Sequence, residues 1–446
     1  MSVWRPVNAA RMAGLLAGAA VWLLAGCQHG PVPRSSDDEV RQRTDAIFEP
    51  LVALRRDLHQ HPEPAGREQR TAATVAARLR ALGLDVRTGL HGHSVVGILR
   101  GALPGRTIAW RAELDALAGE YPDPAPFRSL TPGVHHACGH DLHMAVALGI
   151  AEVLAAQRAS LRGMVVFVFQ PEEETFRGAK ALVERGVFAS TRPDEIYAMH
   201  VTALPVGRIV VRADEMFAHA RRLQLRLKDE LSAAQLQQLG QRVLGALARM
   251  RPGARPWELH QINHPERGLT AAGTDFQDYL IIDPAFDVRR ESGEVVLEAN
   301  LYETSAAALG TLATRVEQVV EAAGHRQALR AVSFVQANPT VQNHAALTAE
   351  ALRILRRSEG AVAVQPSFGQ APFFNDDFAY FQQQVPGVYF FLGGSNTAKG
   401  LVAMNHAPDF QVDEESIRVG VRSFSTLILA RLAALGVAGA SAQNGR

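Results

Sequence analysis

The sequence predicts an α/β protein with a mixed, mostly parallel sheet flanked by helices and an inserted α+β domain of ferredoxin type. Strand-like runs alternate with amphipathic stretches through residues 45–212, the order expected of a parallel sheet covered by helices. Residues 165–169 (VVFVF) contain no polar residue, which is typical of a strand buried on both faces. At 446 residues the chain exceeds what one core organises, so two domains are expected.

The first domain is predicted from residues 45–212 and resumes at 337–440. Apolar residues at helical spacing predict helices over residues 40–59, 68–84, 143–156 and 179–185. Short apolar runs predict strands over residues 95–99, 107–111, 164–169, 195–200 and 207–211. After Asn343 the pattern predicts a helix, then a strand at 388–392, then a helix at 415–435.

The pattern changes after Ala213, which predicts an inserted domain over residues 213–336. Residues 223–228 alternate as a half-exposed strand, and residues 231–249 and 305–323 have helical spacing. Residues 257–262, 295–302 and 330–336 are the other predicted strands, whereas 265–294 are hard to assign. This order fits a β-α-β-β-α-β unit, which is the ferredoxin type.

The N-terminus predicts a secreted, lipid-anchored protein. Arg5 and Arg11 precede an apolar run at residues 12–24, which is shorter than the roughly 18 apolar residues of a spanning helix. The following Leu-Ala-Gly-Cys resembles the lipobox of bacterial lipoproteins, so residues 1–26 are expected to be a signal peptide and Cys27 the lipidated first residue. The alternatives are an ordinary secreted protein or an uncleaved anchor. Gln28, in place of Asp, favours a periplasm-facing position at the outer membrane over the inner one, and residues 27–44 are expected to be a tether.

Cleavage also changes the balance of charges and of cysteines. Loss of Arg5 and Arg11 leaves 44 basic residues against 45 acidic ones, so no basic excess points to a nucleic-acid partner. The expected partners are a small-molecule substrate and, through the lipid on Cys27, a membrane. With Cys27 lipidated, Cys138 has no partner for a disulfide, and metal ligation would explain an unpaired thiol in an oxidising compartment.

Residues 136–143 (HACGHDLH) are the densest group of ligand types in the chain. One thiol, three imidazoles and one carboxylate within eight residues suit a first-row divalent metal, above all zinc. The simpler alternative is a buried cysteine beside surface histidines, since free cysteine is often a small apolar residue.

Other polar groups follow predicted strands. Residues 172–174 (EEE) come after the most apolar strand, His200 closes another, and Asp115 follows residues 107–111. Ligands of α/β sheets bind at the carboxyl ends of strands, so these groups are candidates for one site, together with His406 in a later loop. Taken singly, each has a simpler explanation, such as acids at the start of a helix or a hydrogen-bonded histidine of the core.

Together these motifs resemble the M20 metallopeptidase family, in its amidohydrolase branch of hippurate, N-acyl-amino-acid and auxin-conjugate hydrolases. The resemblance is carried by residues 56–63 (RDLHQHPE), 111–117 (RAELDAL), 132–143 (PGVHHACGHDLH), 170–174 (QPEEE), 204–207, 377–381 and 391–393. It implies a zinc-exopeptidase-like catalytic domain that holds two divalent metal ions, with zinc or manganese expected first and cobalt or nickel as alternatives.

The resemblance also implies residue roles. The implied metal ligands are Cys138, His140, Glu174, His200 and His406, and the implied general base is Glu173. Asp115, Asp141 and His143 are candidates to orient ligands by hydrogen bonds. In this scheme a metal-activated water attacks the amide bond of an N-acyl amino acid or a similar small conjugate. The alternatives are a metallo-dipeptidase or carboxypeptidase and a metal-binding relative with impaired catalysis.

The inserted domain departs from the family pattern. Relatives carry a Gly-Gly-His segment after the first strand of this domain, whose histidine helps to polarise the substrate, but here residues 229–233 read DELSA. The four candidates to replace it are His219, His260, His264 and Gln277. Glu113 also stands where relatives carry Asp. Because these changes spare the implied metal ligands, the sequence favours metal binding more strongly than it favours the family's usual substrates or its homodimer.

Overall fold

The computed structural model describes residues 36–119 and 122–434, all of them in one compact unit. The expected signal peptide (1–26), Cys27 and residues 28–35 lie outside the described residues. Helix α1 (Ser36–Gln60) begins within the expected tether, so residues 36–44 are helical instead, and the acids in its first turn suit the positive end of the helix dipole. No helix in the described ranges combines the length and apolar character needed to cross a membrane.

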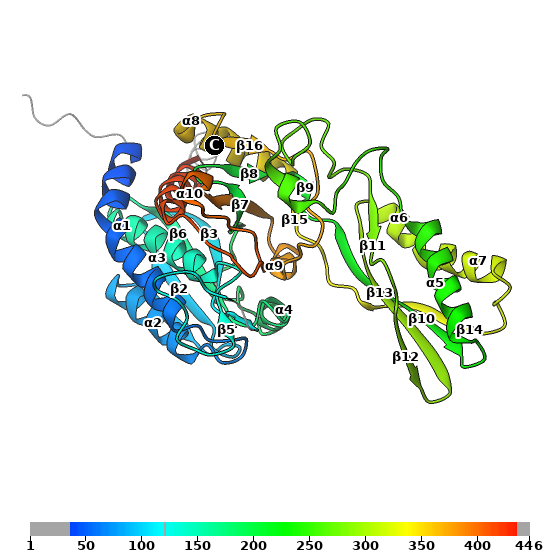
Figure 1. Cartoon of the computed structure of the whole chain (residues 1–446). Helices are drawn as coiled ribbons and strands as arrows, with labels where there is room; N and C mark the ends of the chain where they lie inside the picture. The colour runs from blue at the N-terminus through cyan, green and yellow to red at the C-terminus, as the bar shows by residue number, and fades with distance from the viewer. Residues whose placement is uncertain (1–35, 120–121, 435–446) are drawn as a thin grey trace, which may run out of the picture. The chain divides into compact units, whose positions relative to one another are not determined.

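The larger domain is built on an eight-stranded sheet in the order β1-β2-β6-β3-β7-β17-β8-β16 (Figure 1). Its strands are β1 (Asp85–Thr88), β2 (Val95–Arg100), β3 (Leu103–Glu113), β6 (Arg162–Gln170), β7 (Glu195–Pro205), β8 (Ile209–Val211), β16 (Val364–Pro366) and β17 (Gly387–Ser395). The central strands β6, β3, β7 and β17 are parallel, while β1, β2 and the β17–β8 pair add antiparallel contacts. The sheet is therefore mixed and mostly parallel at its centre.

Helices cover both faces of this sheet. One apolar cluster packs side chains of α1, α2 (Gln69–Ala81), α3 (His140–Ala156), α8 (Ala345–Glu359) and α10 (Glu415–Ala434) against it, and a second involves α4 (Gly178–Glu184) and α9 (Phe378–Gln382). Strand β6 contributes Val165, Phe167 and Phe169 to the first cluster and Val166 and Val168 to the second. The strand is thus buried on both faces, as its uninterrupted apolar run predicts.

The inserted domain has a second, antiparallel sheet in the order β11-β13-β10-β14, with β12 paired to β13. In chain order its elements are β10 (His219–Lys228), α5 (Ala233–Leu247), β11 (Leu280–Ile282), β12 (Asp287–Glu291), β13 (Glu294–Glu303), α6 (Ala306–Gly310), α7 (Leu312–Ala322) and β14 (Leu329–Gln336). This is the β-α-β-β-α-β order of a ferredoxin-type unit whose second strand is split into β11 and β12. Leu223, Leu225 and Leu227 of β10 pack with α5 and α7 in a core of its own.

Two local predictions are wrong. Residues 257–262 are not a strand: they form a turn and a 3₁₀ helix, η1 (Leu259–Asn263), because Pro256 and Pro265 bracket the segment and Leu259 and Ile262 share one face at a spacing of three. The helix expected over residues 305–323 is interrupted at Thr311, between α6 and α7.

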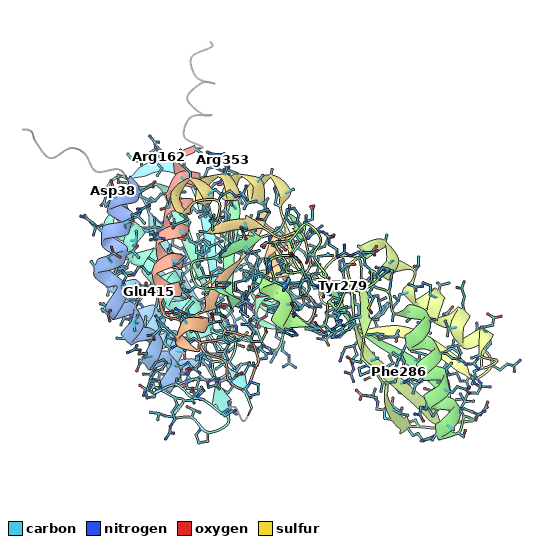
Figure 2. The ribbon with its side chains drawn as sticks, turned by 45° about the horizontal axis from the view of Figure 1, so that its top comes forward. Asp38, Arg162, Tyr279, Phe286, Arg353 and Glu415 are labelled. Carbon is cyan, nitrogen blue, oxygen red and sulfur yellow. The ribbon has the colours of Figure 1, made fainter. Side chains whose placement is uncertain are left out.

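The connection between η1 and β12 contacts both domains. Tyr279 is buried in the cluster that contains α9, and its hydroxyl donates to the carbonyl oxygen of Gln370 at 2.8 Å, whereas Phe286 packs on the core of the insert (Figure 2). The remaining elements are β4 (Leu117–Ala118) with β5 (Val134–His135), β9 (Asp214–Glu215) with β15 (Gln342–Asn343), and η2 (Thr397–Lys399).

Candidate metal centre

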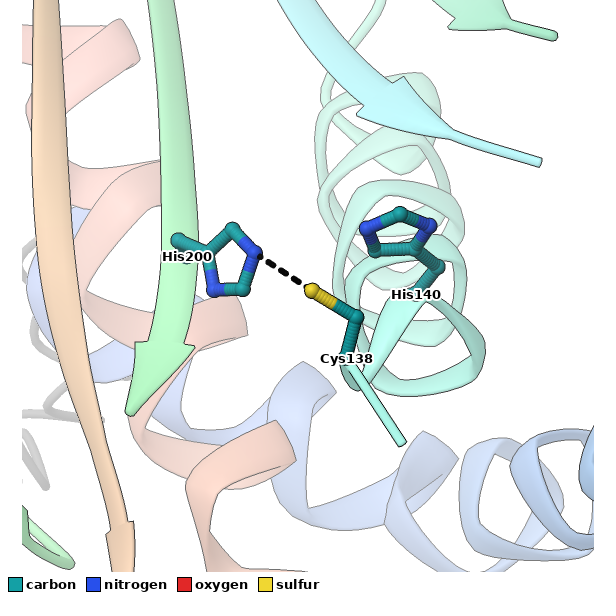
Figure 3. A group of neighbouring side chains, drawn as sticks. All are labelled: Cys138, His140 and His200. Carbon is teal, nitrogen blue, oxygen red and sulfur yellow. Dashed lines mark hydrogen bonds between the residues drawn. The ribbon is translucent and has the colours of Figure 1, made fainter. Parts of the chain in front are cut away.

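The six residues of the expected centre come from four separate parts of the chain. Cys138 and His140 stand at the N-terminal end of α3, Glu173 and Glu174 follow β6, His200 lies within β7, and His406 lies in the loop between β17 and α10. Figure 3 shows His200 on its strand, pointing toward Cys138 beside α3. The parallel strands β6 and β7 end at the same edge of the sheet, which is where α/β proteins bind ligands.

The side chains form two overlapping groups. Sγ of Cys138 lies 3.2 Å from Nε2 of His200 and 3.3 Å from Nε2 of His406. Within each of the groups Cys138–His140–His200 and Cys138–Glu174–His406, the ligand atoms lie within 4.8 Å of one another. Both groups share Cys138, so the structure brings the five implied ligands into two adjacent potential metal sites.

Glu173 belongs to a third group with His140 and Glu174. Its Oε2 lies 3.8 Å from Nε2 of His140, and Oε1 of Glu174 lies 3.9 Å from the same nitrogen. The expected general base therefore lies directly beside the expected ligands, and it immediately precedes one of them, Glu174, in the sequence.

Hydrogen bonds leave the ligating atoms available. Nδ1 of His140 donates to the carbonyl oxygen of Asp115 at 2.7 Å, and Nδ1 of His200 donates to the carbonyl oxygen of Val201 at 2.8 Å. Nε2 of His140 and Oε1 of Glu174 are buried without a hydrogen-bond partner. Buried polar atoms normally have partners, and a thiol, imidazoles and carboxylates are ligands of zinc and other first-row divalent ions. The residues therefore fit two such ions.

The electrostatics of the centre also suit a cation. Burial, reinforced by the charges of Glu174 and Glu173, raises the pKa of the Cys138 thiol well above its usual value. Burial likewise raises the pKa of Glu174 to about 7 and lowers the pKa of His140 to about 4. The protein alone thus favours neutral groups here, and a divalent ion would favour the thiolate and carboxylate forms that ligate it.

The backbone between Cys138 and His140 requires glycine. Gly139 has φ +88°, and a Cβ atom at this position would lie 2.4 Å from Cγ1 of Val201 and 3.2 Å from Cζ of Phe410. Glycine alone combines this left-handed conformation with the close approach to β7. The spacing of the two ligands therefore depends on a residue with no side chain.

Two of the three expected orienting residues contact ligands. Besides accepting from His140, Asp115 accepts the backbone N–H of Glu174 through Oδ2 at 3.0 Å. His143 accepts the backbone N–H of Val201 at 2.9 Å, and its ring centroid lies 4.5 Å from that of His200. Both side chains thus contribute to the placement of ligand residues.

Asp141 has a different role from the expected one. Within the described residues, its side chain contacts Nε of Arg55 at 2.7 Å, Nδ1 of His59 at 2.8 Å and the backbone of Leu142, but no ligand. The carboxylate therefore ties α1 to the start of α3.

A buried charged network beneath the centre was missed by sequence reasoning. Arg111 pairs with Glu113, and its Nη2 lies 3.0 Å from Oδ1 of Asp376 and 3.1 Å from Oδ1 of Asp377. The signal was present, since Arg111 and Asp377 lie within motifs and Asp376 precedes one, but residues 265 positions apart cannot be paired from sequence. Burial raises the pKa of Glu173 well above its usual value, and Asp376 of this network raises it further.

A cavity of about 400 Å³ opens onto the centre. Its lining includes all of the implied ligands except His140, together with Glu173. The insert contributes Ala220, Arg221, Asn300, Tyr302 and Gln336, and Asn338 lies just after it. Apolar residues such as Phe176, Phe217, Leu259, Phe373 and Phe374 are also part of the lining. The four candidates to replace the family's histidine, His219, His260, His264 and Gln277, are not among the described residues that line it. The insert instead presents Arg221 and the amides of Asn300 and Gln336.

An α/β sheet that presents a thiol, imidazoles and paired carboxylates at its strand ends, beside a cavity bordered by a second domain, defines a metal-dependent hydrolase. The family model described as Peptidase family M20/M25/M40 matches residues 109–430. This match spans most of the chain, and the protein belongs to that family.

Similar proteins have related names. The chain is 29% identical over 394 residues to a putative amidohydrolase, YhaA, of Bacillus subtilis, covering 85% of this chain and 94% of that protein. It is 29% identical to thermostable carboxypeptidase 1 of Saccharolobus solfataricus, with 87% and 96% covered. It is also 29% identical to N-acetylcysteine deacetylase of Bacillus subtilis, with 84% and 95% covered.

A solved structure shares the fold. The crystal structure of the Bacillus subtilis YXEP protein, described as a dinuclear metal-binding peptidase of the M20 family, matches with a TM-score of 0.69 and 25% identity. The match covers 87% of this chain and 99% of that chain. Both domains therefore lie within the shared architecture.

Proposed function

We propose that the protein is a metal-dependent amidohydrolase that cleaves the amide bond of N-acyl amino acids or similar small conjugates. The observation that carries this proposal is the convergence of Cys138, His140, Glu174, His200 and His406 with Glu173 beside them. The similarity to proteins named amidohydrolase and N-acetylcysteine deacetylase supports the substrate class.

The metal-binding residues and Glu173 would have separate roles in the proposed hydrolysis. When bound, two divalent ions would polarise the scissile carbonyl and lower the pKa of a water molecule. Glu173, next to ligand Glu174 and on the cavity wall, is placed to accept the proton of the attacking water and to return it to the leaving amine. In the metal-free protein, burial and the charge of Asp376 raise the pKa of Glu173 well above its usual value, and bound divalent ions would oppose this shift and favour the carboxylate that accepts the proton.

The test compares wild type with Glu173→Gln after removal of metal and reconstitution with Zn²⁺ or Mn²⁺. We expect wild type to hydrolyse members of a panel of N-acetyl and N-benzoyl amino acids only when loaded with metal. Glu173→Gln should retain its metal content while kcat falls about 10²- to 10⁴-fold, the range for loss of a general base. A wild-type protein that binds no divalent metal, or a variant with unchanged hydrolysis, would refute the proposal.

A dipeptidase or carboxypeptidase activity of the same centre is the second candidate, because the chain is also similar to a thermostable carboxypeptidase. Dipeptides and N-acyl amino acids assayed side by side distinguish the two, by the relative kcat/KM and the amine released. Metal binding without turnover of either class would instead favour a relative with impaired catalysis.

We also propose that the mature protein is anchored through lipid on Cys27 and faces the periplasm, as the Leu-Ala-Gly-Cys segment predicts. Cys27→Ser should move the protein from the membrane fraction to the soluble periplasmic fraction. Secretion without a lipid would leave both proteins in the soluble fraction. The homodimer expected from the family stays a prediction, for which analytical ultracentrifugation of the Cys27→Ser protein is the measurement.

A further inference from the structure

A hollow of about 550 Å³ in the larger domain is lined by residues from the start of α1, the start of β6 and the C-terminal parts of α8 and α10. Arg162, Arg353 and Arg357 belong to this lining, together with Asp37 and apolar side chains such as Leu432. Figure 2 shows Arg162 and Arg353 at the same end of the larger domain. We refer to this region as the basic hollow.

Two of these arginines have no partner within the part of the chain that the structure describes. Arg162 and Arg357 are exposed, and neither makes a hydrogen bond or an ion pair with a described residue. Arg353 contacts Glu350 of its own helix at 2.7 Å. Asp37 is the one acid among the described lining residues, so the lining carries three positive charges against one negative charge.

The segments that adjoin the basic hollow in sequence supply no acidic side chain. Residues 28–35 (QHGPVPRS) precede α1 and residues 435–446 (LGVAGASAQNGR) follow α10, and neither segment contains Asp or Glu. Over the expected mature chain, 44 basic residues nearly balance 45 acidic ones, so the positive charge of the hollow is local. An anionic partner for Arg162 and Arg357 therefore comes from another molecule.

A phosphate group matches the two unpaired arginines in charge and in geometry. The planar guanidinium forms paired hydrogen bonds with phosphate oxygens. Anionic phospholipids present such groups at high density on a membrane surface, and each arginine close to that surface strengthens binding roughly fivefold.

The expected lipid anchor brings a membrane near the basic hollow. Cys27 precedes Ser36, the first residue of α1, by nine positions, and nine extended residues span about 30 Å at most. Asp37, in the first turn of α1, lines the hollow. A lipid on Cys27 therefore keeps the wall formed by α1 within about 30 Å of the membrane surface.

We propose that the basic hollow binds the phosphate head groups of anionic phospholipids in the membrane that holds the anchor. This inference rests on the lipid anchor proposed above and adds a second contact, made by charge. Arg162 begins β6, whereas Glu173 and Glu174 follow its end, so the hollow and the metal centre lie at opposite edges of the sheet. Head groups at the hollow leave the cavity of the metal centre facing away from the membrane.

The test measures binding of the Cys27→Ser protein, which lacks the proposed lipid, to sedimented vesicles. We expect it to bind vesicles of phosphatidylcholine with about 40% phosphatidylglycerol, and to bind pure phosphatidylcholine at least about tenfold more weakly. Binding should fall as salt rises from about 20 mM to about 300 mM, because salt screens exposed charges. Arg162→Gln combined with Arg357→Gln should lower the partition coefficient about 10- to 30-fold, the effect of two arginines at the surface.

Arg242→Gln combined with Arg330→Gln is the matched control in the same Cys27→Ser background. Both arginines are exposed residues of the insert without an ion pair among the described residues, so the net charge changes by the same amount. This variant should bind within about twofold of its parent, and both double variants should keep the parent's Tm. Equal loss in the two double variants would indicate attraction by net charge alone and overturn the inference.

The vesicle experiment does not depend on the anchor, because the protein used in it carries no lipid. Failure of the anchor would show in the fractionation of wild type against Cys27→Ser, whereas failure of the hollow shows only here. Absence of binding to the anionic vesicles, or equal binding to the neutral ones, would overturn the role of the basic hollow even if the anchor is present.

Discussion

Oε2 of Glu113 lies 2.7 Å from Nδ1 of His143 in the buried layer beneath the metal centre. Because Nε2 of His143 accepts the backbone N–H of Val201, the imidazole is held at both nitrogens beside the ring of His200. Glu113 also pairs with Arg111, so one carboxylate links the charged network to the support of a ligand. Glutamate has the length to make both contacts at once.

Removing this charge should destabilise the fold. Glu113→Gln leaves Arg111 without one of its buried partners, and loss of one member of a buried pair costs about 3–5 kcal/mol. Urea unfolding of the metal-free protein measures the change. The control is Glu291→Gln, which removes an acid from an exposed pair with Arg226 and should cost under about 1 kcal/mol. Equal effects of the two variants would contradict the structural role of Glu113.

Gly139 should be intolerant of a side chain. Gly139→Ala places Cβ against Val201 in a backbone with φ +88°. In addition to the strain of a left-handed alanine, we expect this crowding to lower the free energy of unfolding by about 1–3 kcal/mol. Metal binding should also become weaker. Gly207→Ala is the matched control, because Gly207 has the same φ of +88° and a Cβ added there would meet no atom within 4 Å. Thermal unfolding and metal titration of both variants separate crowding from backbone strain.

Metal removal should lower the free energy of unfolding, because only the folded chain brings Cys138, Glu174 and His406 close enough to hold an ion. We expect chelation to lower Tm and re-addition of Zn²⁺ to restore it, since a ligand that binds only the folded state stabilises it. Cobalt-loaded wild type should show a thiolate-to-cobalt charge-transfer band that is absent from Cys138→Ser. Retention of the band in Cys138→Ser would exclude this cysteine as a ligand.

Acid should weaken the hydrogen-bond network around Asp123, which involves none of the expected metal ligands. Oδ2 of Asp123 accepts the backbone N–H of Ser129 and lies 3.0 Å from His59 and 3.1 Å from His135. Burial would raise the pKa of Asp123, but the hydrogen bonds from His135 and His59 dominate and lower it well below its usual value. A carboxyl with a depressed folded pKa stabilises the protein above its unfolded pKa of about 3.9 and loses that contribution as pH falls toward the folded pKa.

Asp123→Asn should therefore reduce the unfolding free energy by about 1–3 kcal/mol at pH 7, and its difference from wild type should shrink as pH falls below about 4. Urea unfolding at pH 7 and at pH 3.5 measures both values. Asp85→Asn, at an exposed position on β1, should differ little from wild type at either pH. A gap for Asp123→Asn that grows in acid would contradict the assigned direction.

The sequence predicted elements best where a local pattern had one physical meaning. Uninterrupted apolar runs marked β6 and β17, and helical spacing marked α1 and α10, because burial on both faces and on one face leave different periodicities. The strand predicted over residues 257–262 was wrong because a short apolar run fits either a strand or one helical turn. The split second strand of the insert was missed because exposed residues of β12 carry no apolar signal.

What the sequence by itself determined was the family, and it predicted the ligand set, since Cys138 and His140, and Glu173 and Glu174, lie in short motifs whose chemistry can be read locally. Tertiary structure alone decided which polar groups surround them. Arg221 lines the cavity and His219 does not, although the two are neighbours in sequence, and Asp141 turns to α1 although it adjoins His140. Burial, ion pairing and access are set by contacts between residues far apart in the chain, and no local pattern encodes them.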